Sequence, residues 1–189
     1  MEVFDDAANI PTEALQRIAV VGTSCSGKTT FSRQLATLLG LTHIELDSLF
    51  WTPNWVGRPV PEFCRLVEQE IATDSWITDG NFYFVRNIVW SRATTVIWLN
   101  YSFPIVFARA ISRTVRRAWT QEEVFSSGNY ESFRRAFLST DSIPLWVVRT
   151  FWRNRRDYKA LQKSDKWPHL SFIELQHPKQ ANAFLSGHG

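Results

Sequence analysis

Five short apolar runs alternate along the chain with segments whose apolar residues repeat at helical spacing. The runs cover residues 17–22, 42–46, 75–79, 94–99 and 170–175. Short runs rich in β-branched residues are typical of parallel strands that are buried on both faces. The alternation of strands and helices therefore predicts an α/β fold, in which helices cover both faces of a parallel sheet.

The segments between the runs carry the marks of amphipathic helices. Residues 31–39 place four apolar side chains on one helical face, and Gly40 follows where a helix C-terminus favours glycine. Residues 63–71 repeat the pattern behind two prolines. Two longer helices are predicted further on, one beginning after Ser102 and the other spanning roughly residues 142–162.

Length and periodicity together indicate how the chain is divided. The chain has 189 residues, which is enough for one domain with a real core. Residues 1–15 show no sustained periodicity and predict a flexible N-terminal arm. Residues 16–189 are predicted to form a single domain, in which residues 120–129 (TQEEVFSSGN) are the best candidate for a flexible connection.

The stretch GTSCSGKT, residues 22–29, lies between the first strand and the first helix. A phosphate loop needs a tight turn with inward-facing N–H groups, a lysine for the outer phosphates and a hydroxyl for Mg²⁺. The pattern GxxxxGK[ST] supplies all three, with the strand before it and the helix after it that the pattern requires. We therefore predict that residues 22–29 bind phosphate groups and that Lys28 is catalytic.

Two carboxylates follow predicted strands. Asp79 comes at the end of the third strand and Asp47 just after the second. Ligands of open parallel sheets gather at the carboxyl ends of the strands, so Asp79 is placed to hold Mg²⁺ through water. Asp47 is a candidate for sharing the metal or for taking a proton from an acceptor hydroxyl. The structural alternatives are an exposed turn aspartate for Asp79 and an ordinary helix cap for Asp47.

Positive charge is concentrated in one third of the chain. The net charge is +3, yet residues 101–160 hold eleven Lys and Arg against five Asp and Glu. Two predicted helices there carry arginine stripes: Arg109, Arg113 and Arg116 on the first, and Arg149, Arg153 and Arg156 on the second. Such a concentration of cations indicates an anionic ligand.

The regular spacing of these arginines suggests a lid. Phosphoryl transfer is catalysed largely by cations that close over the transferred group. We therefore predict an arginine-rich lid around residues 113–156. Its catalytic candidates are Arg113, Arg116, Arg149 and Arg153. The alternative is a solvated helix face paired with nearby acidic residues.

An aromatic cluster follows Asp47. Phe50, Trp51 and Trp55 lie within SLFWTPNWVGRP. Aromatic side chains in this position either wall a flat pocket that stacks on a ring or form core beneath a loop. We expect Phe50 to be core and Trp51 to line the pocket.

The ordered series of motifs resembles a known family. It comprises GTSCSGKTT, HIELDSLFWTPNW, WITDGNF, TTVIWLN, RTVRRAWTQEEVFSSGNYESF and STDSIPLWVVRT. Together, over residues 17–185, these segments resemble the small adenylate-kinase-like P-loop proteins of the DNA topology modulation (FlaR-like) family. The series is far more specific than the phosphate loop alone.

The resemblance implies a nucleoside-monophosphate-kinase-like three-layer P-loop fold with a five-stranded parallel sheet of order 2-3-1-4-5. It implies Mg²⁺ near Thr29 and Asp79 and a short lid that bears arginines. It also implies that ATP binds the segment Gly22, Thr23, Ser24, Cys25, Ser26, Gly27, Lys28, Thr29 and Thr30.

The acceptor side departs from true adenylate kinases. Those enzymes resemble D-G-F-P-R after the third strand, whereas this chain has DGNF with the nearest arginine at Arg86. Their Thr-Gly-Asp-like turn after the second strand is replaced by residues 46–48 (LDS). The motifs that bind the phosphate donor are kept, whereas those that bind the acceptor are changed. This difference argues against AMP as the acceptor.

These observations favour an ATP-dependent phosphotransferase that acts on a nucleotide or another small molecule. The alternative is a nucleotide-binding regulator that contacts DNA, which clustered Lys and Arg permit. A hydrolase is weaker because no residue stands out for positioning water. The apolar runs fall far short of the roughly 18 residues that a membrane span needs, and the first residues are acidic, so we expect a cytoplasmic protein with no membrane partner.

Overall fold

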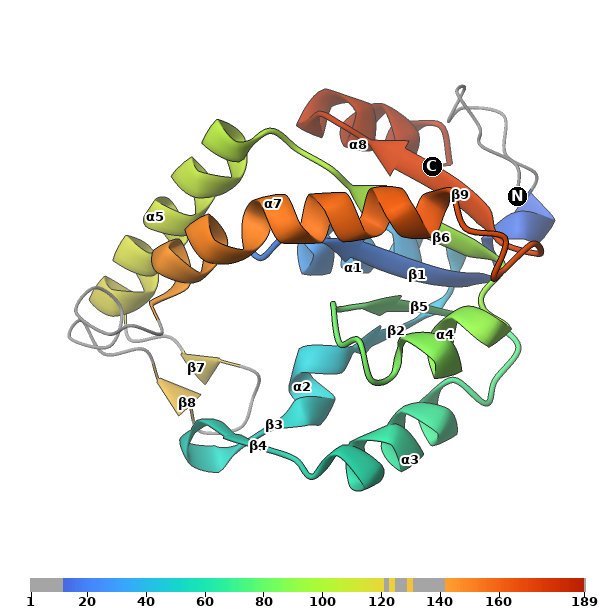
Figure 1. The fold of residues 1–189 in the computed structure, drawn as a ribbon, viewed down its shortest axis with the longest axis horizontal. Helices are drawn as coiled ribbons and strands as arrows, with labels where there is room; N and C mark the ends of the chain where they lie inside the picture. The colour runs from blue at the N-terminus through green and yellow to red at the C-terminus, as the bar shows by residue number, and fades with distance from the viewer. Residues whose placement is uncertain (1–11, 121–122, 125–128, 131–141, 189) are drawn as a thin grey trace.

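A five-stranded parallel sheet runs through the middle of the molecule (Figure 1). The computed structural model describes residues 12–120, 123–124, 129–130 and 142–188. The strands, in chain order, are β1 Arg17–Gly22, β2 Thr42–Glu45, β5 Trp76–Asp79, β6 Thr95–Leu99 and β9 Ser171–Leu175. Their spatial order is β2-β5-β1-β6-β9. Both the α/β class and the 2-3-1-4-5 order expected from the sequence are confirmed.

Helices connect the strands as the periodicity predicts. The longer ones are α1 Lys28–Leu39, α3 Val60–Glu70, α4 Arg86–Arg92, α5 Phe103–Thr120, α7 Ile143–Gln162 and α8 Pro178–Ser186. Helix α1 ends at Gly40, whose φ of 67° is in the left-handed region that favours glycine at this position. Ser142 is the N-cap residue of α7.

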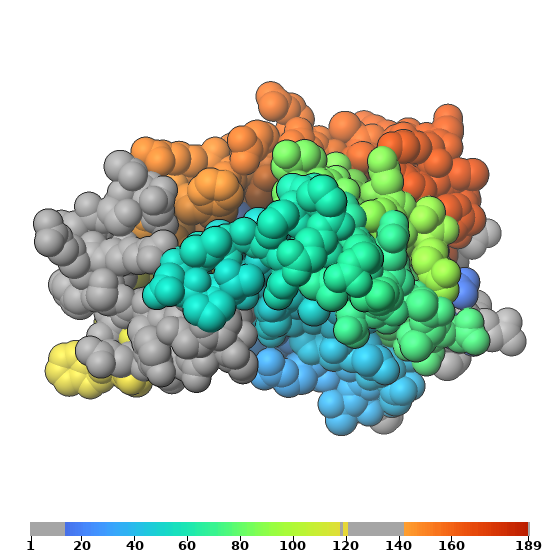
Figure 2. Space-filling view, turned by 90° about the horizontal axis from the view of Figure 1, so that it is seen from below, coloured from blue at the N-terminus to red at the C-terminus, as the bar shows by residue number. Residues whose placement is uncertain are grey.

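Several short elements complete the chain. They are η1 Thr12–Leu15, α2 Leu46–Phe50, η2 Pro53–Trp55 and the paired strands β3 Trp51–Thr52 with β4 Val56–Gly57 and β7 Glu123–Val124 with β8 Asn129–Tyr130. In the space-filling view the segment of β3, η2 and β4 (turquoise) projects from the face formed by α3 and α4 (Figure 2). Strand β8 lies against η2, so the two short hairpins meet (Figure 1).

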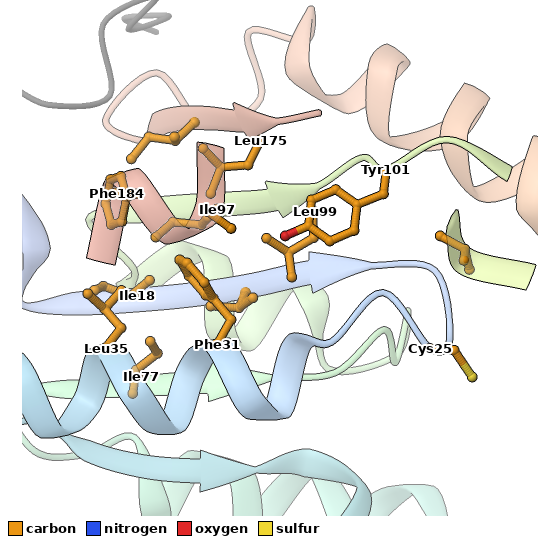
Figure 3. Close-up of a cluster of buried hydrophobic side chains, with 14 of the residues drawn as sticks. Ile18, Cys25, Phe31, Leu35, Ile77, Ile97, Leu99, Tyr101, Leu175 and Phe184 are labelled. Atoms are coloured by element: carbon orange, nitrogen blue, oxygen red, sulfur yellow. The ribbon is translucent and has the colours of Figure 1, made fainter. Parts of the chain in front are cut away.

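The core has two halves, one on each face of the sheet. Alternate residues of β1 serve the two halves: Ile18 and Val20 face one, and Ala19 and Val21 face the other. The first half packs α1 and α8 against the sheet, and Figure 3 shows Phe31 of α1 and Phe184 of α8 on that side. The second half packs α3, α4 and the end of α7 against the opposite face. The arrangement is a three-layer sandwich.

The predicted flexible arm over residues 1–15 is wrong at its inner end. Residues 12–15 form η1, and Leu15 is buried in the core. The hydroxyls of Thr94 and Thr95 donate hydrogen bonds of 2.7 and 2.6 Å to the carbonyl of Ala14. These contacts come from residues 80 and 81 positions away, so local periodicity gave no sign of them. Residues 1–11 lie outside the described part of the chain.

The predicted connection and lid are described only in part. Residues 121–122, 125–128 and 131–141 of the lid around residues 113–156 lie outside the described ranges. The predicted flexible connection, residues 120–129, contains β7 and the first residue of β8, which pair with each other. Helices α5 and α7, which flank it, pack on each other, with the rings of Phe103 and Phe151 in edge contact at 5.3 Å.

Candidate nucleotide and phosphoryl-transfer site

The segment from Gly22 to Gly27 forms a tight loop between β1 and α1. Cys25 and Gly27 adopt positive φ angles of 67° and 94°, and the amide of Ser26 donates a 3.0 Å hydrogen bond to the carbonyl of Thr23. At Gly22, φ is 150° and a Cβ would lie 2.7 Å from the carbonyl oxygen of Leu99, so only glycine fits. The predicted loop is therefore in the strand–turn–helix setting that phosphate binding requires.

Lys28 is the first residue of α1, and its side chain folds back over the loop. Its ammonium donates hydrogen bonds of 2.9 and 3.3 Å to the carbonyl oxygens of Gly22 and Thr23. Burial lowers the pKa of Lys28, while the carboxylates of Asp47 and Asp79 act in the opposite direction. The lysine and both predicted carboxylates therefore share one electrostatic neighbourhood.

Thr29 and Asp79 meet at the carboxyl end of the sheet. The hydroxyl of Thr29 donates a hydrogen bond of 2.5 Å to Oδ2 of Asp79. The other carboxylate oxygen, Oδ1, lies 2.9 Å from Nε2 of His43 on the neighbouring strand β2. Asp79 is only 1% exposed, so the alternative of an exposed turn aspartate is wrong. His43 was not predicted as a site residue, although a histidine inside the apolar run THIEL was a signal.

The Thr29–Asp79 pair has the chemistry of a magnesium site. Mg²⁺ prefers oxygen ligands, keeps several waters and is usually held by one or two carboxylates together with substrate phosphates. Within the described ranges no group of three His, Cys, Asp or Glu side chains is placed to hold a metal by itself. A hydroxyl and a buried carboxylate beside the phosphate loop fit an ion that shares its ligands with phosphate and water.

Asp47 lies in the short helix α2, directly after β2. The pKa of its carboxyl is raised to about 6, chiefly by burial and further by the charges of Asp79 and Glu45. Lys28 and Arg113 oppose this shift. A carboxylate with a pKa near 6 is ionised at neutral pH and still basic enough to accept a proton. The same surroundings raise the pKa of Glu45, again chiefly by burial.

Asn81 connects the end of β5 to the phosphate loop. Its Oδ1 accepts a hydrogen bond of 3.2 Å from the amide of Gly22, and its Nδ2 donates to the carbonyl of the same residue. The hydroxyl of Tyr158 on α7 donates to the same Oδ1 at 2.9 Å. Nothing in the local sequence singled out either residue, because their contacts join segments 59 and 77 positions apart.

The arginines of α5 divide by position. Arg109 Nη1 donates a 2.7 Å hydrogen bond to the carbonyl of Ser26, and its guanidinium lies 5.3 Å from the centre of the Tyr101 ring. Arg113 is half-buried, and its charge lowers the pKa of both Lys28 and Asp47. The structure thus brings Arg113 to the site, and it places Arg109, which was not predicted to be catalytic, against the loop.

The other predicted lid arginines, Arg116, Arg149 and Arg153, are exposed on α5 and α7. Their proposed role in closing over a phosphate stays a prediction.

The aromatic residues that follow Asp47 pack against one another and against neighbouring aromatic rings. Phe50 was expected in the core; it is partly buried and packs against the core through Phe63 and Phe82, with ring centres 5.2 and 4.8 Å away. Trp51 is half-buried between Phe50 and Trp55.

Several solved structures are similar to this chain in fold. A shikimate kinase from Acinetobacter baumannii in complex with shikimate aligns with a TM-score of 0.56 at 18% identity, covering 93% of each chain. The chain has the fold of the P-loop kinases. A shikimate kinase from Aquifex aeolicus gives a TM-score of 0.52 at 14% identity and covers 90% of this chain and 91% of its own. A gluconokinase from Sinorhizobium meliloti gives 0.51 at 14% identity, with 92% and 91% covered.

At these identities the likeness shows the fold and no more. No family model and no curated protein matches the sequence. In the described part of the chain, no helix is long and apolar enough to cross a membrane.

Proposed function

We propose that this P-loop kinase-like protein is an ATP- and Mg²⁺-dependent phosphotransferase that moves the γ-phosphate to a small-molecule acceptor. The observation that carries the proposal is the bond of 2.5 Å between Thr29 and Asp79 beside Lys28. It joins the hydroxyl of the loop to a buried carboxylate at the end of a neighbouring strand. That pairing is what a phosphate loop with a shared magnesium ion requires.

Asp47 supports a hydroxyl as the accepting group. In the proposed step Asp47 takes the proton of the acceptor hydroxyl. The hydroxyl oxygen bonds to the γ-phosphorus as the bond between that phosphorus and the β,γ-bridging oxygen of ATP breaks. The products are ADP and a phosphorylated acceptor. The pKa of about 6 leaves Asp47 unprotonated at neutral pH and able to accept that proton. A nucleotide hydroxyl and a hydroxyl of another small metabolite both satisfy this chemistry.

The other site residues would stabilise the negative charge of the phosphate groups. Lys28 and Arg113 supply positive charge next to Asp47 and Asp79, where phosphate charge develops during transfer. Thr29 and Asp79 would hold Mg²⁺, which neutralises phosphate charge when bound. The three solved structures named above are kinases, one of them with shikimate bound, and their names favour a small hydroxylated acceptor.

The likeness to the DNA topology modulation family is part of the same proposal. A kinase of that family and a regulator that contacts DNA use the same phosphate loop, so the loop does not separate them. The hydrogen bond from Thr29 to the buried Asp79 and the shifted pKa of Asp47 favour the kinase, because binding to a phosphate backbone needs neither.

A screen for the acceptor tests the proposal. ADP formation from ATP and Mg²⁺ would be measured with nucleosides, nucleotides, sugars, sugar acids and hydroxylated ring acids, one at a time. We expect one class of hydroxylated compound to raise ADP formation and to appear as its phosphomonoester by mass spectrometry. ADP formation that no compound raises, with inorganic phosphate as the product, would contradict the proposal in favour of hydrolysis.

A further inference from the structure

We propose that Asn81 positions the phosphate loop and that Tyr158 couples helix α7 to the loop through Asn81. The inference rests on the proposed function, because it assigns both residues a part in nucleotide binding. Four hydrogen bonds carry it, and they meet at Gly22 and Asn81.

The Asn81 amide binds both backbone groups of one residue. Its Oδ1 accepts from the amide of Gly22 at 3.2 Å, and its Nδ2 donates to the carbonyl of Gly22. The hydroxyl of Tyr158 donates to Oδ1 as well, at 2.9 Å. If the amide were flipped, Gly22 N–H would face a donor and its carbonyl an acceptor. The network therefore fixes one orientation of the side chain.

Gly22 is where such a restraint matters. Its φ of 150° and the 2.7 Å approach of a Cβ to the Leu99 carbonyl restrict this position to glycine, which has the freest backbone of any residue. The carbonyl of Gly22 also accepts the 2.9 Å hydrogen bond from Lys28 Nζ. By holding that carbonyl, Asn81 fixes the group to which the ammonium of Lys28 is anchored. Asn81 thus acts on the loop and on its lysine at one point.

Tyr158 is built to act as a permanent donor. It is buried, and burial raises the pKa of its hydroxyl to about 12, so the proton stays in place at neutral pH. Its ring lies 5.7 Å from the ring of Trp98 and 5.8 Å from the guanidinium carbon of Arg86. These neighbours set the position of the hydroxyl opposite Asn81.

Helix α7 connects this contact to the predicted lid. The helix runs unbroken from Ile143 to Gln162. Arg149 and Arg153 precede Tyr158 along it, and Phe151 packs on α5. Figure 1 shows α7 (orange) crossing the face of the sheet from α5 toward β9. A continuous helix moves as one element, so a displacement at the arginine end also shifts Tyr158. The bond to Asn81 then transmits that shift to the phosphate loop.

A double-mutant cycle on the full-length protein tests the coupling. The dissociation constant of ATP would be measured by calorimetry for Asn81→Ala, Tyr158→Phe and the double variant. We expect Asn81→Ala to weaken binding at least tenfold and Tyr158→Phe by about two- to tenfold, the range of one lost hydrogen bond. If Tyr158 acts through Asn81, adding Tyr158→Phe to Asn81→Ala has no further effect. A Tyr158→Phe effect that persists unchanged in the Asn81→Ala background would overturn the coupling.

Matched controls separate this role from a general loss of stability. Asn182→Ala on α8 and Tyr83→Phe change exposed residues and should leave ATP affinity unchanged. Asn81→Asp keeps the two acceptor bonds and loses only the donor, so it carries the test if Asn81→Ala does not fold. It should also weaken binding, because its carboxylate repels the Gly22 carbonyl.

Amide hydrogen exchange without nucleotide tests the inference independently of the proposed function. Asn81→Ala and Tyr158→Phe should speed exchange in residues 22–28 and leave β6 protected. Faster exchange in both segments, or in neither, would show that the residues are merely structural and the inference wrong. A parent protein that binds no ATP would instead defeat the proposed function, and the exchange measurement would still decide whether Asn81 and Tyr158 hold the loop.

Discussion

Thr29 and Asp79 lie fifty positions apart in the chain, yet the threonine hydroxyl donates a 2.5 Å hydrogen bond to the aspartate. The contact arises because β5 pairs with β1, with Asp79 beside Val20, so the end of β5 lies next to the start of the phosphate loop. His43 holds the second carboxylate oxygen at 2.9 Å. The carboxylate is therefore fixed on both sides in a buried position.

This relationship predicts a magnesium phenotype. Asp79→Asn should raise the Mg²⁺ concentration required for half-maximal turnover at least tenfold, because a neutral amide is a poorer partner for the hydrated metal. Thr29→Val should do the same, and Thr29→Ser should restore much of the loss. Titrating Mg²⁺ at saturating ATP gives the measurement, with the exposed Asp74→Asn as control. An unchanged Mg²⁺ requirement in Asp79→Asn would remove the metal role.

Lys28→Ala should abolish ATP turnover and leave the fold intact. One lost phosphate contact of this kind costs a few kcal/mol in the transition state, or roughly a hundredfold or more in rate. The side chain donates hydrogen bonds to two loop carbonyls, and alanine is a good helix former at the first position of α1. Turnover assays and thermal unfolding would be compared with the exposed Lys159→Ala. Turnover at the parental rate would rule out the phosphate-loop assignment.

The raised pKa of Asp47 leads us to expect that turnover depends on pH. Its carboxyl has a pKa of about 6, so the base is protonated at lower pH and turnover should fall as the pH drops through about 6. Asp47→Asn should lose this limb of the profile. Its turnover rate should be lower by at least about a hundredfold, with little change in the Mg²⁺ requirement. If instead Asp47→Asn and Asp79→Asn shift the metal requirement alike, Asp47 is a metal partner and no base.

The same shift predicts a gain of stability in that variant. The pKa of Asp47 is raised from 3.8 to about 6 on folding, so between these values the folded state binds more protons and stability falls as pH rises. At pH 7 the buried charge costs at most roughly 3 kcal/mol. Asp47→Asn should therefore unfold at a higher urea concentration than the parent at pH 7, and the difference should shrink toward pH 4. If the urea midpoints of variant and parent differed equally at both pH values, the raised pKa of Asp47 would be contradicted.

The arginines distinguish a kinase lid from a basic binding surface. Arg113→Lys keeps the charge but loses the planar two-pronged donor, so it should lower turnover about tenfold or more if Arg113 contacts transferring phosphate. The same substitution at Arg116, Arg149 and Arg153 tests the rest of the predicted lid, with the exposed Arg65→Lys as control. On a surface that only attracts a polyanion, lysine variants should be silent and alanine variants should weaken DNA binding with a shallower salt slope. Silent lysine variants throughout would end the lid hypothesis.

The sequence by itself determined the strands, the main helices and the phosphate loop. Each depends on local features: β-branched runs for strands such as residues 17–22, helical spacing for α1 and α3, and the glycine positions of the loop. Asp79 was found because its position at the end of a strand places it at the ligand-binding edge of a parallel sheet. The strand order came from the resemblance, since apolar runs do not say which neighbours they pair with.

Tertiary structure decided the contacts between distant segments. His43, Asn81 and Tyr158 became part of the site only when strand pairing and the path of α7 brought them to the loop. Leu15 belongs to the core because the hydroxyls of Thr94 and Thr95 hold the carbonyl beside it. The pKa of Asp47 follows from burial and from charges on four other elements, α1, β2, β5 and α5. Hydrogen bonds and charges act through space, so local patterns of sequence carry little record of partners many residues away.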